Sequence, residues 1–401
     1  MHGLYYPKNC NLYFLTLTLQ LKFIYSNKME YSQRYQELNS QFSFGTDTHL
    51  IESNIDIRYF SFQSTNEEDI NGNSNYIFRD KTIVENLSFN YPVFMPHGLN
   101  KADNAILLLH GLNERNWNKY LTWAEYLCSK TGKPIILFPI AFHMNRSPQR
   151  WSNPRALQSI MDIRRQANGA DRSLSFANVA LSERISENPY RFYSSGRQSI
   201  RDLSTLFTQI KGGKHVSFKE NTQIDIFAYS IGAFLAEITM LANPIGLFSS
   251  SKLFLFCGGG IFSSMVGQSR SIMDKKAFHI LYDYYLNRFN KSETEKLPTD
   301  IMFESFNTMI STDRNKLDRE HFFSQFENNL KGISLKDDKV MIFDGIPEAL
   351  GADYAAKQIK QMDFSFPYTH ENPFPVNGLV DSNEVDAGFL TVFSEIAEFF
   401  S

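Results

Sequence analysis

Ser230 lies at the junction of two apolar segments of different periodicity, and this placement could make its hydroxyl a nucleophile. A short β-prone run, residues 224–227, precedes the serine, and the residues that follow it predict a helix. The chain must therefore turn sharply at the serine, and so tight a turn tolerates only small residues two positions to either side. Ala228 and Gly232 occupy these positions. At such an apex the hydroxyl would stand clear of the sheet, with a helix N-terminus behind it.

A serine hydroxyl is a weak nucleophile at neutral pH, so it needs a base, a carboxylate that orients the base, and donors for a developing oxyanion. His370 is the candidate base, because it alone among the nine histidines follows both the serine turn and the strand expected to carry the acid. In the alternative interpretation His370 is a loop histidine held by Glu371 or Asn372. The backbone N–H of Ile231 is the first candidate oxyanion donor.

The sequence AYSIG at residues 228–232 resembles the GxSxG nucleophile elbow of the α/β-hydrolase superfamily, with Ala228 in place of the first glycine. The resemblance implies the chain order nucleophile, acid, histidine, each at the end of a successive strand. It places the acid about three residues after the glycine that ends the strand in MIFDGIPEALGAD, at Glu348. Asp344 at the strand tip is the alternative acid, and Asp353 is a more distant one.

The resemblance also implies that a second backbone N–H completes the oxyanion site. It would come from the HGLN segment that follows the apolar run 105–109, at Leu112, and would act with the N–H of Ile231. We expect His110, at the start of HGLN, to be structural.

Several short apolar runs have the composition of strands buried on both faces of a parallel sheet, and helical patterns lie between them. Strands that alternate with helices predict a doubly wound, mostly parallel sheet, which in this resemblance is the α/β-hydrolase fold. The predicted strands of this sheet are residues 105–109, 134–141, 224–227, 253–257, 340–343 and 364–368.

The alternation of strands and helices also predicts how the chain is divided. Residues 1–28 would be an extension, residues 29–86 an N-terminal segment with an edge hairpin at 55–62 and 76–78, and residues 87–401 the hydrolase domain. Two insertions, at about 144–195 and 263–335, interrupt the domain and predict helical caps above the carboxyl edge of the sheet. We expect substrate choice to reside in these caps.

Residues 11–25 are apolar, but Gln20 and Lys22 interrupt them and no small-residue cleavage site follows, which argues against a signal peptide. The stretch is also too short and too polar for a membrane span. Met29 opens a more ordinary sequence, so one hypothesis is that translation begins there; mass spectrometry of the native N-terminus tests it. We expect a cytoplasmic protein, with secretion as the alternative.

Arginines are dense at the start of the first insertion, where Arg146, Arg150 and Arg155 surround Trp151. They could clamp a carboxylate or phosphate on a substrate, or they could form ion pairs and packing contacts within the cap. In the second insertion, aromatic residues could line an acyl pocket or pack the cap down: Phe262, Phe278, Tyr282, Tyr284 and Tyr285.

The overall composition excludes several classes of partner. The chain has 40 Lys and Arg against 43 Asp and Glu, so no global field would recruit nucleic acid or an anionic membrane. Three cysteines without CxxC spacing argue against a disulfide framework and a zinc site. The phosphate-loop, HExxH and dinucleotide-binding motifs are absent, so we expect no metal and no cofactor.

These features together predict a serine hydrolase that cleaves carboxylic esters, with lipid-like esters among the candidate substrates, through Ser230, His370 and Glu348. An acyltransferase or a peptidase would use the same residues. A catalytically inactive hydrolase fold that serves as a binding protein is the alternative from another class. The sequence makes no prediction about oligomeric state.

Overall fold

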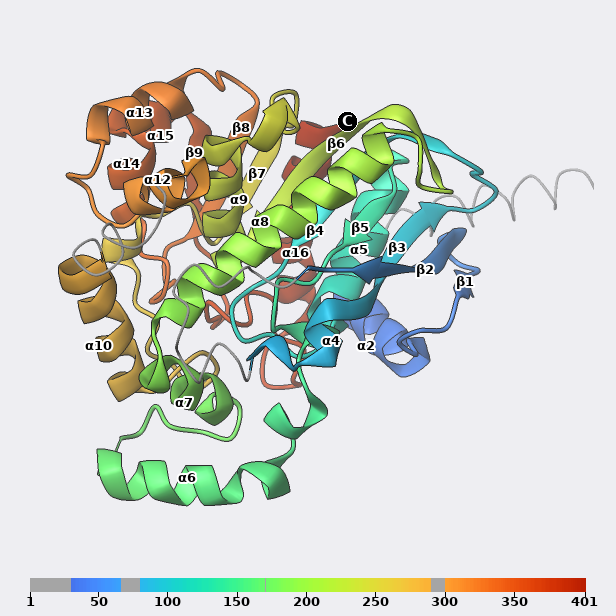
Figure 1. Cartoon of the computed structure of the whole chain (residues 1–401). Coiled ribbons are helices and arrows are strands. Elements are labelled where there is room, and N and C mark those ends of the chain that lie inside the picture. The colour runs from blue at the N-terminus through green and yellow to red at the C-terminus, as the bar shows by residue number, and fades with distance from the viewer. Residues whose placement is uncertain (1–29, 66–79, 170, 290–299) are drawn as a thin grey trace, which may run out of the picture.

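The computed structural model describes residues 30–65, 80–169, 171–289 and 300–401 (Figure 1). Among these residues, nine strands form one sheet in the order β1-β2-β3-β5-β4-β6-β7-β8-β9. The strands are β1 (Thr48–Leu50), β2 (Ile55–Gln63), β3 (Ser88–Pro96), β4 (Ala102–Leu109), β5 (Ile135–Leu137), β6 (Phe218–Tyr229), β7 (Leu253–Phe256), β8 (Leu330–Leu335) and β9 (Ile359–Met362).

The sheet has an antiparallel edge and a parallel body. Strands β1, β2 and β3 pair antiparallel, and β3 also pairs antiparallel with β5. From β5 to β9 every neighbouring pair is parallel. All residues of β4 from Ala105 to Leu109 are buried, as its unbroken apolar run predicts for a strand covered on both faces.

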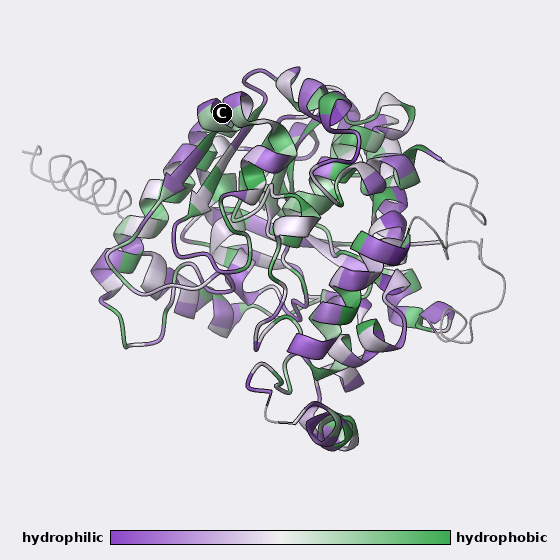
Figure 2. Ribbon diagram, turned by 90° about the vertical axis from the view of Figure 1, so that its left-hand side faces the viewer, coloured by the Kyte–Doolittle hydropathy of each residue, from purple (hydrophilic) through white to green (hydrophobic). Residues whose placement is uncertain are grey.

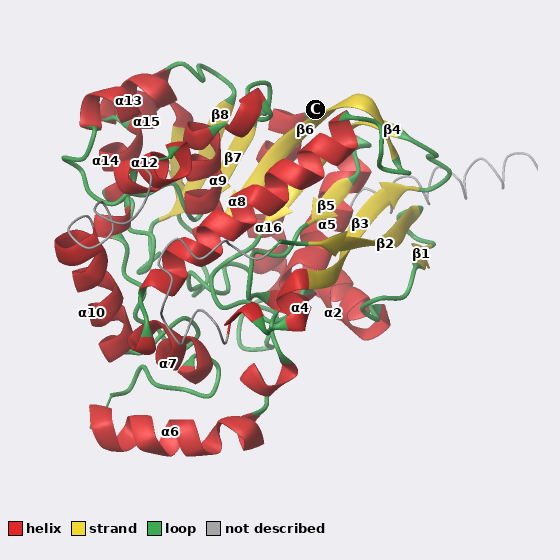
Figure 3. Ribbon diagram, viewed as in Figure 1, coloured by secondary structure: helices red, strands yellow, loops and turns green. Residues whose placement is uncertain are grey.

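Helices cover both faces of the sheet, so that the described part of the chain has three layers (Figures 1 and 3). The principal helices are α2 (Tyr31–Gln41), α4 (Val84–Leu87), α5 (Asn118–Thr131), α6 (Pro154–Asn168), α7 (Val179–Glu187), α8 (Tyr190–Lys211), α9 (Ile231–Ala242), α10 (Lys275–Asp283), α12 (Ile301–Thr308), α13 (Lys316–Ser324), α14 (Gly345–Leu350), α15 (Ala352–Gln358) and α16 (Ser382–Phe400).

Two hydrophobic cores lie on opposite sides of the sheet. Helices α2, α5 and α16 pack on one face, where β6 contributes Phe227 and Tyr229. Helices α8 and α9 pack on the other, where β6 contributes Ile226 and Ala228. Successive side chains of a strand point to opposite faces, so this one strand supplies both cores. Hydrophobic segments accordingly concentrate in the interior (Figure 2).

We call α6, α7 and α10 the cap helices, because they lie together at one end of the molecule, with α6 farthest from the sheet (Figure 1). Helices α6 and α7 fall in the first predicted insertion and α10 in the second. A small hydrophobic cluster joins α6 to α7 and is separate from the two large cores: Leu157, Met161, Leu174, Val179 and Ala180. Among the described residues, no helix is both long and apolar enough to cross a bilayer.

Two strands predicted from the sequence are not strands of the sheet, and a third lies outside the described residues. Residues 76–78 lie outside the described residues. Residues 340–343 and 364–368 are not strands of the sheet. Its last two strands are β8, which the sequence analysis had placed in a helical insertion, and β9, which it had not predicted as a strand. The β8 sequence LKGISL alternates only weakly, and its pairing is set by tertiary contact, since a Cβ on Gly332 would lie 2.8 Å from the backbone oxygen of Leu255.

Candidate active site

Ser230 joins β6 to α9 with an unusual backbone, at φ 59° and ψ −124°. A positive φ is costly for a residue with a side chain and persists only where the surroundings enforce it. The Ser230 N–H donates to the backbone oxygen of Phe256, at 3.1 Å, on the neighbouring strand. A Cβ on Gly232 would lie 2.7 Å from the backbone oxygen of Leu109, so only glycine fits there. The sharp strand-to-helix turn predicted from the sequence is therefore present.

Ser230, His370 and Asp338 form a continuous hydrogen-bonded relay. The Ser230 Oγ lies 2.6 Å from the His370 Nε2, and the His370 Nδ1 lies 2.7 Å from the Asp338 Oδ2. With the Nδ1 proton donated to the carboxylate, Nε2 is left to accept the serine proton. All three side chains are buried, with Ser230 2% and His370 and Asp338 each 4% exposed. Burial strengthens each of these bonds because little water competes for them.

The predicted acid is therefore corrected: the carboxylate that contacts His370 is Asp338, and neither Glu348 nor Asp344. Glu348 lies on α14, where its Oε2 accepts a hydrogen bond of 2.5 Å from Ser264. Asp344 is exposed just before α14, and Asp353 is exposed on α15. The error follows from placing the acid-bearing strand at 340–343. With β8 recognised at Leu330–Leu335, the first turn after the strand contains Asp338.

Neighbouring groups hold the acid and the base in place. The Asp338 Oδ1 accepts the backbone N–H groups of Val340 and Met341, both at 2.8 Å, so the carboxylate cannot rotate away from the histidine. The Tyr229 hydroxyl donates to the backbone oxygen of His370, and the two rings stack with centroids 5.7 Å apart. The Glu371 carboxylate accepts from Ser269 instead of holding His370.

The two backbone N–H groups predicted for an oxyanion site come from the residue after Ser230 and from the loop after β4, whose backbone packs against the serine turn at Gly232. Ile231 is the first residue of α9, a position whose N–H has no acceptor within the helix. Leu112 follows β4, and the N–H of its neighbour Gly111 is taken by the Tyr120 hydroxyl at 2.9 Å. Among the described residues, neither the Ile231 nor the Leu112 N–H has a hydrogen-bond acceptor. Both residues line the cavities beside Ser230.

His110 is structural, as expected. Its Nδ1 donates to the backbone oxygen of Gly111 at 2.8 Å, and its Nε2 accepts the N–H of Ile140 at 2.9 Å. Complete burial, with a smaller contribution from His143, holds the pKa of this imidazole well below its ordinary value. The histidine is therefore neutral and fixes the loop that carries Leu112.

Two cavities meet beside Ser230 and share Leu112, Phe192 and Ile231 in their walls. The smaller, about 390 Å³ and also partly open to solvent, includes Ser230 itself. Apart from the serine, its side chains are apolar, among them Phe262, Met265, Ile272, Met273, Phe278 and Leu281. The larger, about 940 Å³ and partly open to solvent, combines apolar side chains with arginines and His143. The site can thus hold a ligand on both sides of the serine.

The arginines of the predicted clamp do not line these cavities. Arg146 is fully buried and donates to the Asp202 Oδ2 at 2.7 Å and to two backbone oxygens, so it is a packing residue. Arg150 and Arg155 are exposed. Trp151 does line the larger cavity, where the Arg184 guanidinium lies 4.2 Å from its ring centroid. The sequence analysis named none of the arginines that do line the larger cavity, among them Arg115 in the HGLNER segment directly after β4.

The predicted aromatic pocket is correct in part. Phe262 and Phe278 line the smaller cavity. Tyr282 and Tyr285 instead bind the backbone through their hydroxyls, Tyr282 to Ser263 and Tyr285 to Pro189, and thereby fasten α10 and the turn after it.

One cluster of described residues has the donors for a metal ion, at the antiparallel edge of the sheet. The Nδ1 atoms of His49 and His97 lie 2.8 and 2.9 Å from the Asp56 Oδ1. The second oxygen of Asp56 is paired with Arg58 at 3.0 Å. The cluster lies on and beside β1 and β2, whereas Ser230 follows β6 in the middle of the sheet, so it is not part of the serine site.

The antiparallel edge, the parallel body and the serine turn after β6 define an α/β-hydrolase fold. The chain belongs to a family of unknown function, DUF6051, whose model matches residues 29–401. No curated protein matches the chain by sequence.

Several solved structures share the arrangement at low identity. An S-formylglutathione hydrolase from Agrobacterium tumefaciens is 12% identical, with a TM-score of 0.46, over 90% of this chain and 100% of that one. A thermostable esterase from Pseudomonas putida ECU1011 is 10% identical, with a TM-score of 0.41, over 93% of this chain and 97% of that one. A carboxyl esterase from the fungus Tuber melanosporum is 9% identical, with a TM-score of 0.41 and the same coverage of both chains. Similarities this distant say nothing about substrate.

Proposed function

We propose that this protein is a serine hydrolase that cleaves carboxylic esters through Ser230, His370 and Asp338. The observation that carries the proposal is the relay from Ser230 Oγ through both nitrogens of His370 to Asp338, on a turn with strained backbone. Serine at such a turn, a histidine within hydrogen-bond reach and a buried carboxylate behind it are the parts that acyl transfer requires.

In this mechanism His370 takes the Ser230 proton on Nε2 as the Oγ attacks the ester carbonyl. The N–H groups of Ile231 and Leu112 stabilise the negative charge on the carbonyl oxygen. The C–O bond to the alcohol then breaks, and His370 donates its proton to the departing oxygen. Water attacks the acyl-enzyme with His370 again as the base, and the acid leaves as the Ser230 hydroxyl is restored. Asp338 holds the imidazole and stabilises its charged form throughout.

The smaller cavity favours esters with an apolar group on one side of the scissile bond, since its walls next to Ser230 are made of apolar side chains. This supports small or lipid-like esters as the substrate class.

The test is covalent labelling with a fluorophosphonate probe, followed by peptide mass spectrometry. The wild-type protein is expected to carry one label, on Ser230, and Ser230→Ala none. Hydrolysis of p-nitrophenyl esters should be lost in the same variant. Labelling that persists in folded Ser230→Ala would refute the nucleophile. A folded wild type that neither labels nor hydrolyses any ester would favour the binding-protein alternative.

A further inference from the structure

Four arginines line the larger cavity, and three of them are neutralised by carboxylates. Arg184 binds the Asp80 Oδ1 at 2.8 Å, and Arg191 binds the Asp80 Oδ2 at 2.7 Å. Arg197 binds Asp300 through two nitrogens, one of them at 2.7 Å. Arg191 also binds the Glu187 Oε2 at 2.5 Å, so three carboxylates balance the three charges. These three arginines therefore give the cavity shape but little net attraction for an anion.

Arg115 is the fourth arginine, and no carboxylate of the described residues pairs with it. Its one hydrogen bond runs from Nη2 to the Asn113 Oδ1, at 2.7 Å. Its Nε is buried and has no hydrogen-bond partner in the part of the chain that the structure describes. Burial, and after it the charge of Arg184, lowers the Arg115 pKa to about 10, so the side chain still carries its charge at neutral pH. Arg115 as a whole is half-buried. A cation partly removed from water without a counter-ion is costly, and a bound anion would offset that cost.

The neighbours of Arg115 hold it ready to bind. The Asn113 side-chain amide donates to two backbone oxygens, those of Ala177 at 2.9 Å and Ser271 at 2.6 Å. These two bonds occupy the amide nitrogen, so the amide oxygen is directed to Arg115. Ala177 and Ser271 lie next to the cap helices α7 and α10, which means that the cap sets the orientation of this arginine. A preorganised guanidinium loses little freedom when it binds a planar anion.

Arg115 lies close enough to Ser230 along the cavity walls for one ligand to reach both residues. Leu112, three residues before Arg115, and Ile231, next to Ser230, belong to the walls of both cavities. A molecule bound across the serine would have one end in the smaller, apolar cavity. Its other end would lie in the cavity that holds the unpaired cation.

We propose that the substrate is an anionic ester, with an apolar group in the smaller cavity and a carboxylate bound by Arg115 in the larger one. The proposal rests on the proposed esterase function and specifies its substrate class. His143, which also lines the larger cavity, donates its Nδ1 proton to the backbone oxygen of Ala141 at 2.8 Å, and its Nε2 has no partner among the described residues. As a neutral acceptor it can take a hydrogen bond from a hydroxyl of the ligand but adds no charge. Arg115 is therefore the group that would distinguish an anionic ligand from a neutral one.

Binding to Ser230→Ala, measured by calorimetry, tests the proposal without relying on turnover. The ligands are monoesters of straight-chain dicarboxylic acids from succinate to sebacate, each compared with the neutral diester of the same acid. Fatty-acyl esters of hydroxy acids place the carboxylate on the alcohol side instead. At least one anionic ligand is expected to bind more tightly than its neutral counterpart. Adding Arg115→Gln should reduce that preference roughly 10- to 100-fold, the effect of losing a charged hydrogen bond.

Two further variants make the comparison specific. Arg150→Gln removes an exposed arginine outside the cavities and should leave the preference intact. Arg115→Lys keeps the charge without the planar fork and should retain part of the preference, which also covers the case in which Arg115→Gln does not fold. Equal binding of anionic and neutral ligands, no binding of any, or a preference unaffected in both Arg115 variants overturns the proposal.

Kinetics separate this proposal from the esterase function itself. In the Ser230-containing protein, the ratio of kcat/KM for monoester to that for diester should fall in Arg115→Gln and hold in Arg150→Gln. Selective binding of carboxylates without hydrolysis of any ester would refute the esterase function while leaving the Arg115 site in place. Hydrolysis of esters with no preference for anions would support the esterase function and refute the Arg115 site.

Discussion

The carboxylate behind His370 decides how well the imidazole can act as a base. Asp338 uses both of its oxygens, one for the His370 Nδ1 and one for two backbone N–H groups, so its position does not depend on solvent. Glu348, by contrast, is exposed and bound to Ser264. Substitutions of the two carboxylates should therefore have opposite effects: a large loss of activity for Asp338 and almost none for Glu348.

Asp338→Asn is expected to reduce kcat roughly 10²- to 10⁴-fold while the fold is retained. The amide cannot balance the charge of the imidazolium, and its NH₂ group favours the wrong histidine tautomer. Steady-state hydrolysis of p-nitrophenyl esters measures the effect.

Glu348→Gln is the matched control, since it removes the charge of the carboxylate that the sequence alone favoured. It should change kcat by less than about twofold, in line with an exposed surface substitution. A large loss in Glu348→Gln together with a small one in Asp338→Asn would contradict the assignment.

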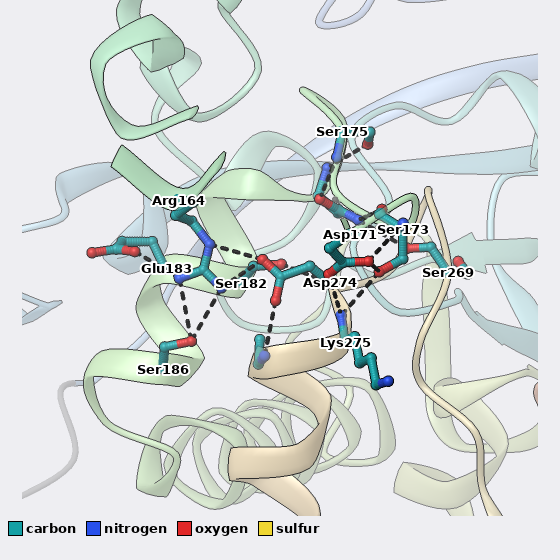
Figure 4. Close-up of polar contacts among 12 residues, drawn as sticks. Arg164, Asp171, Ser173, Ser175, Ser182, Glu183, Ser186, Ser269, Asp274 and Lys275 are labelled. Carbon is teal, nitrogen blue, oxygen red and sulfur yellow. Dashed lines mark hydrogen bonds and ion pairs between the residues drawn. The ribbon is translucent and has the colours of Figure 1, made fainter. Parts of the chain in front are cut away.

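At the scale of elements, one buried ion pair ties the cap helices together. Figure 4 shows Arg164 of α6 reaching across to Asp274 at the start of α10. The Arg164 Nη2 lies 2.5 Å from the Asp274 Oδ2, with side chains 6% and 0% exposed. The other Asp274 oxygen accepts the N–H of Ala277 and caps α10, and the Asp274 N–H donates to Ser182 of α7. One aspartate thus joins the three cap helices.

Asp274→Ala should destabilise the protein by about 2–4 kcal/mol, because it leaves the buried Arg164 with only the half-exposed Glu183 as counter-ion, at 2.8 Å, and removes the cap of α10. Urea unfolding followed by circular dichroism measures the loss. The control is Asp162→Ala on α6, whose Oδ1 lies 3.9 Å from the Nη1 of the exposed Arg165. That exposed pair is worth about 0.5 kcal/mol or less. Equal stability of the two variants would show that the buried pair does not hold the cap.

At the scale of the whole molecule, stability should depend on pH through histidines that are buried in neutral form. Burial lowers the His143 pKa from 6.5 to about 4. Above pH 6.5 the imidazole is neutral in both the folded and the unfolded chain, so it contributes no pH dependence. Between pH 6.5 and about 4 the unfolded chain binds a proton that the folded protein does not, and folding is penalised progressively.

His143→Asn removes this titration and can still donate to Ala141. Wild type should therefore lose roughly 2–3 kcal/mol more than the variant between pH 7 and pH 4. Urea unfolding at a series of pH values measures the difference. His279→Asn, at an exposed position on α10, should follow the wild-type profile. If the His143→Asn profile coincides with that of wild type, the imidazole is not buried in neutral form.

The features that the sequence determined by itself depend on neighbouring residues or on the order of elements along the chain. The turn at Ser230 follows from a β-prone run, small residues and a helical pattern within about fifteen positions of one another. Strands such as β4 carry unbroken apolar runs because both faces are covered, so the parallel sheet can be predicted from the sequence alone. His370 followed from chain order.

Only the tertiary structure decided the partners of these groups. Strand β8 has too weak a pattern to stand out, and its place between β7 and β9 comes from pairing with them, which brings Asp338 to His370. Arg146 and Arg115 look equally available in the sequence, yet one meets Asp202 and the other meets no carboxylate among the described residues. Whether an arginine is neutralised or left to bind a ligand depends on the groups that face it, and elements far apart in the chain supply those groups.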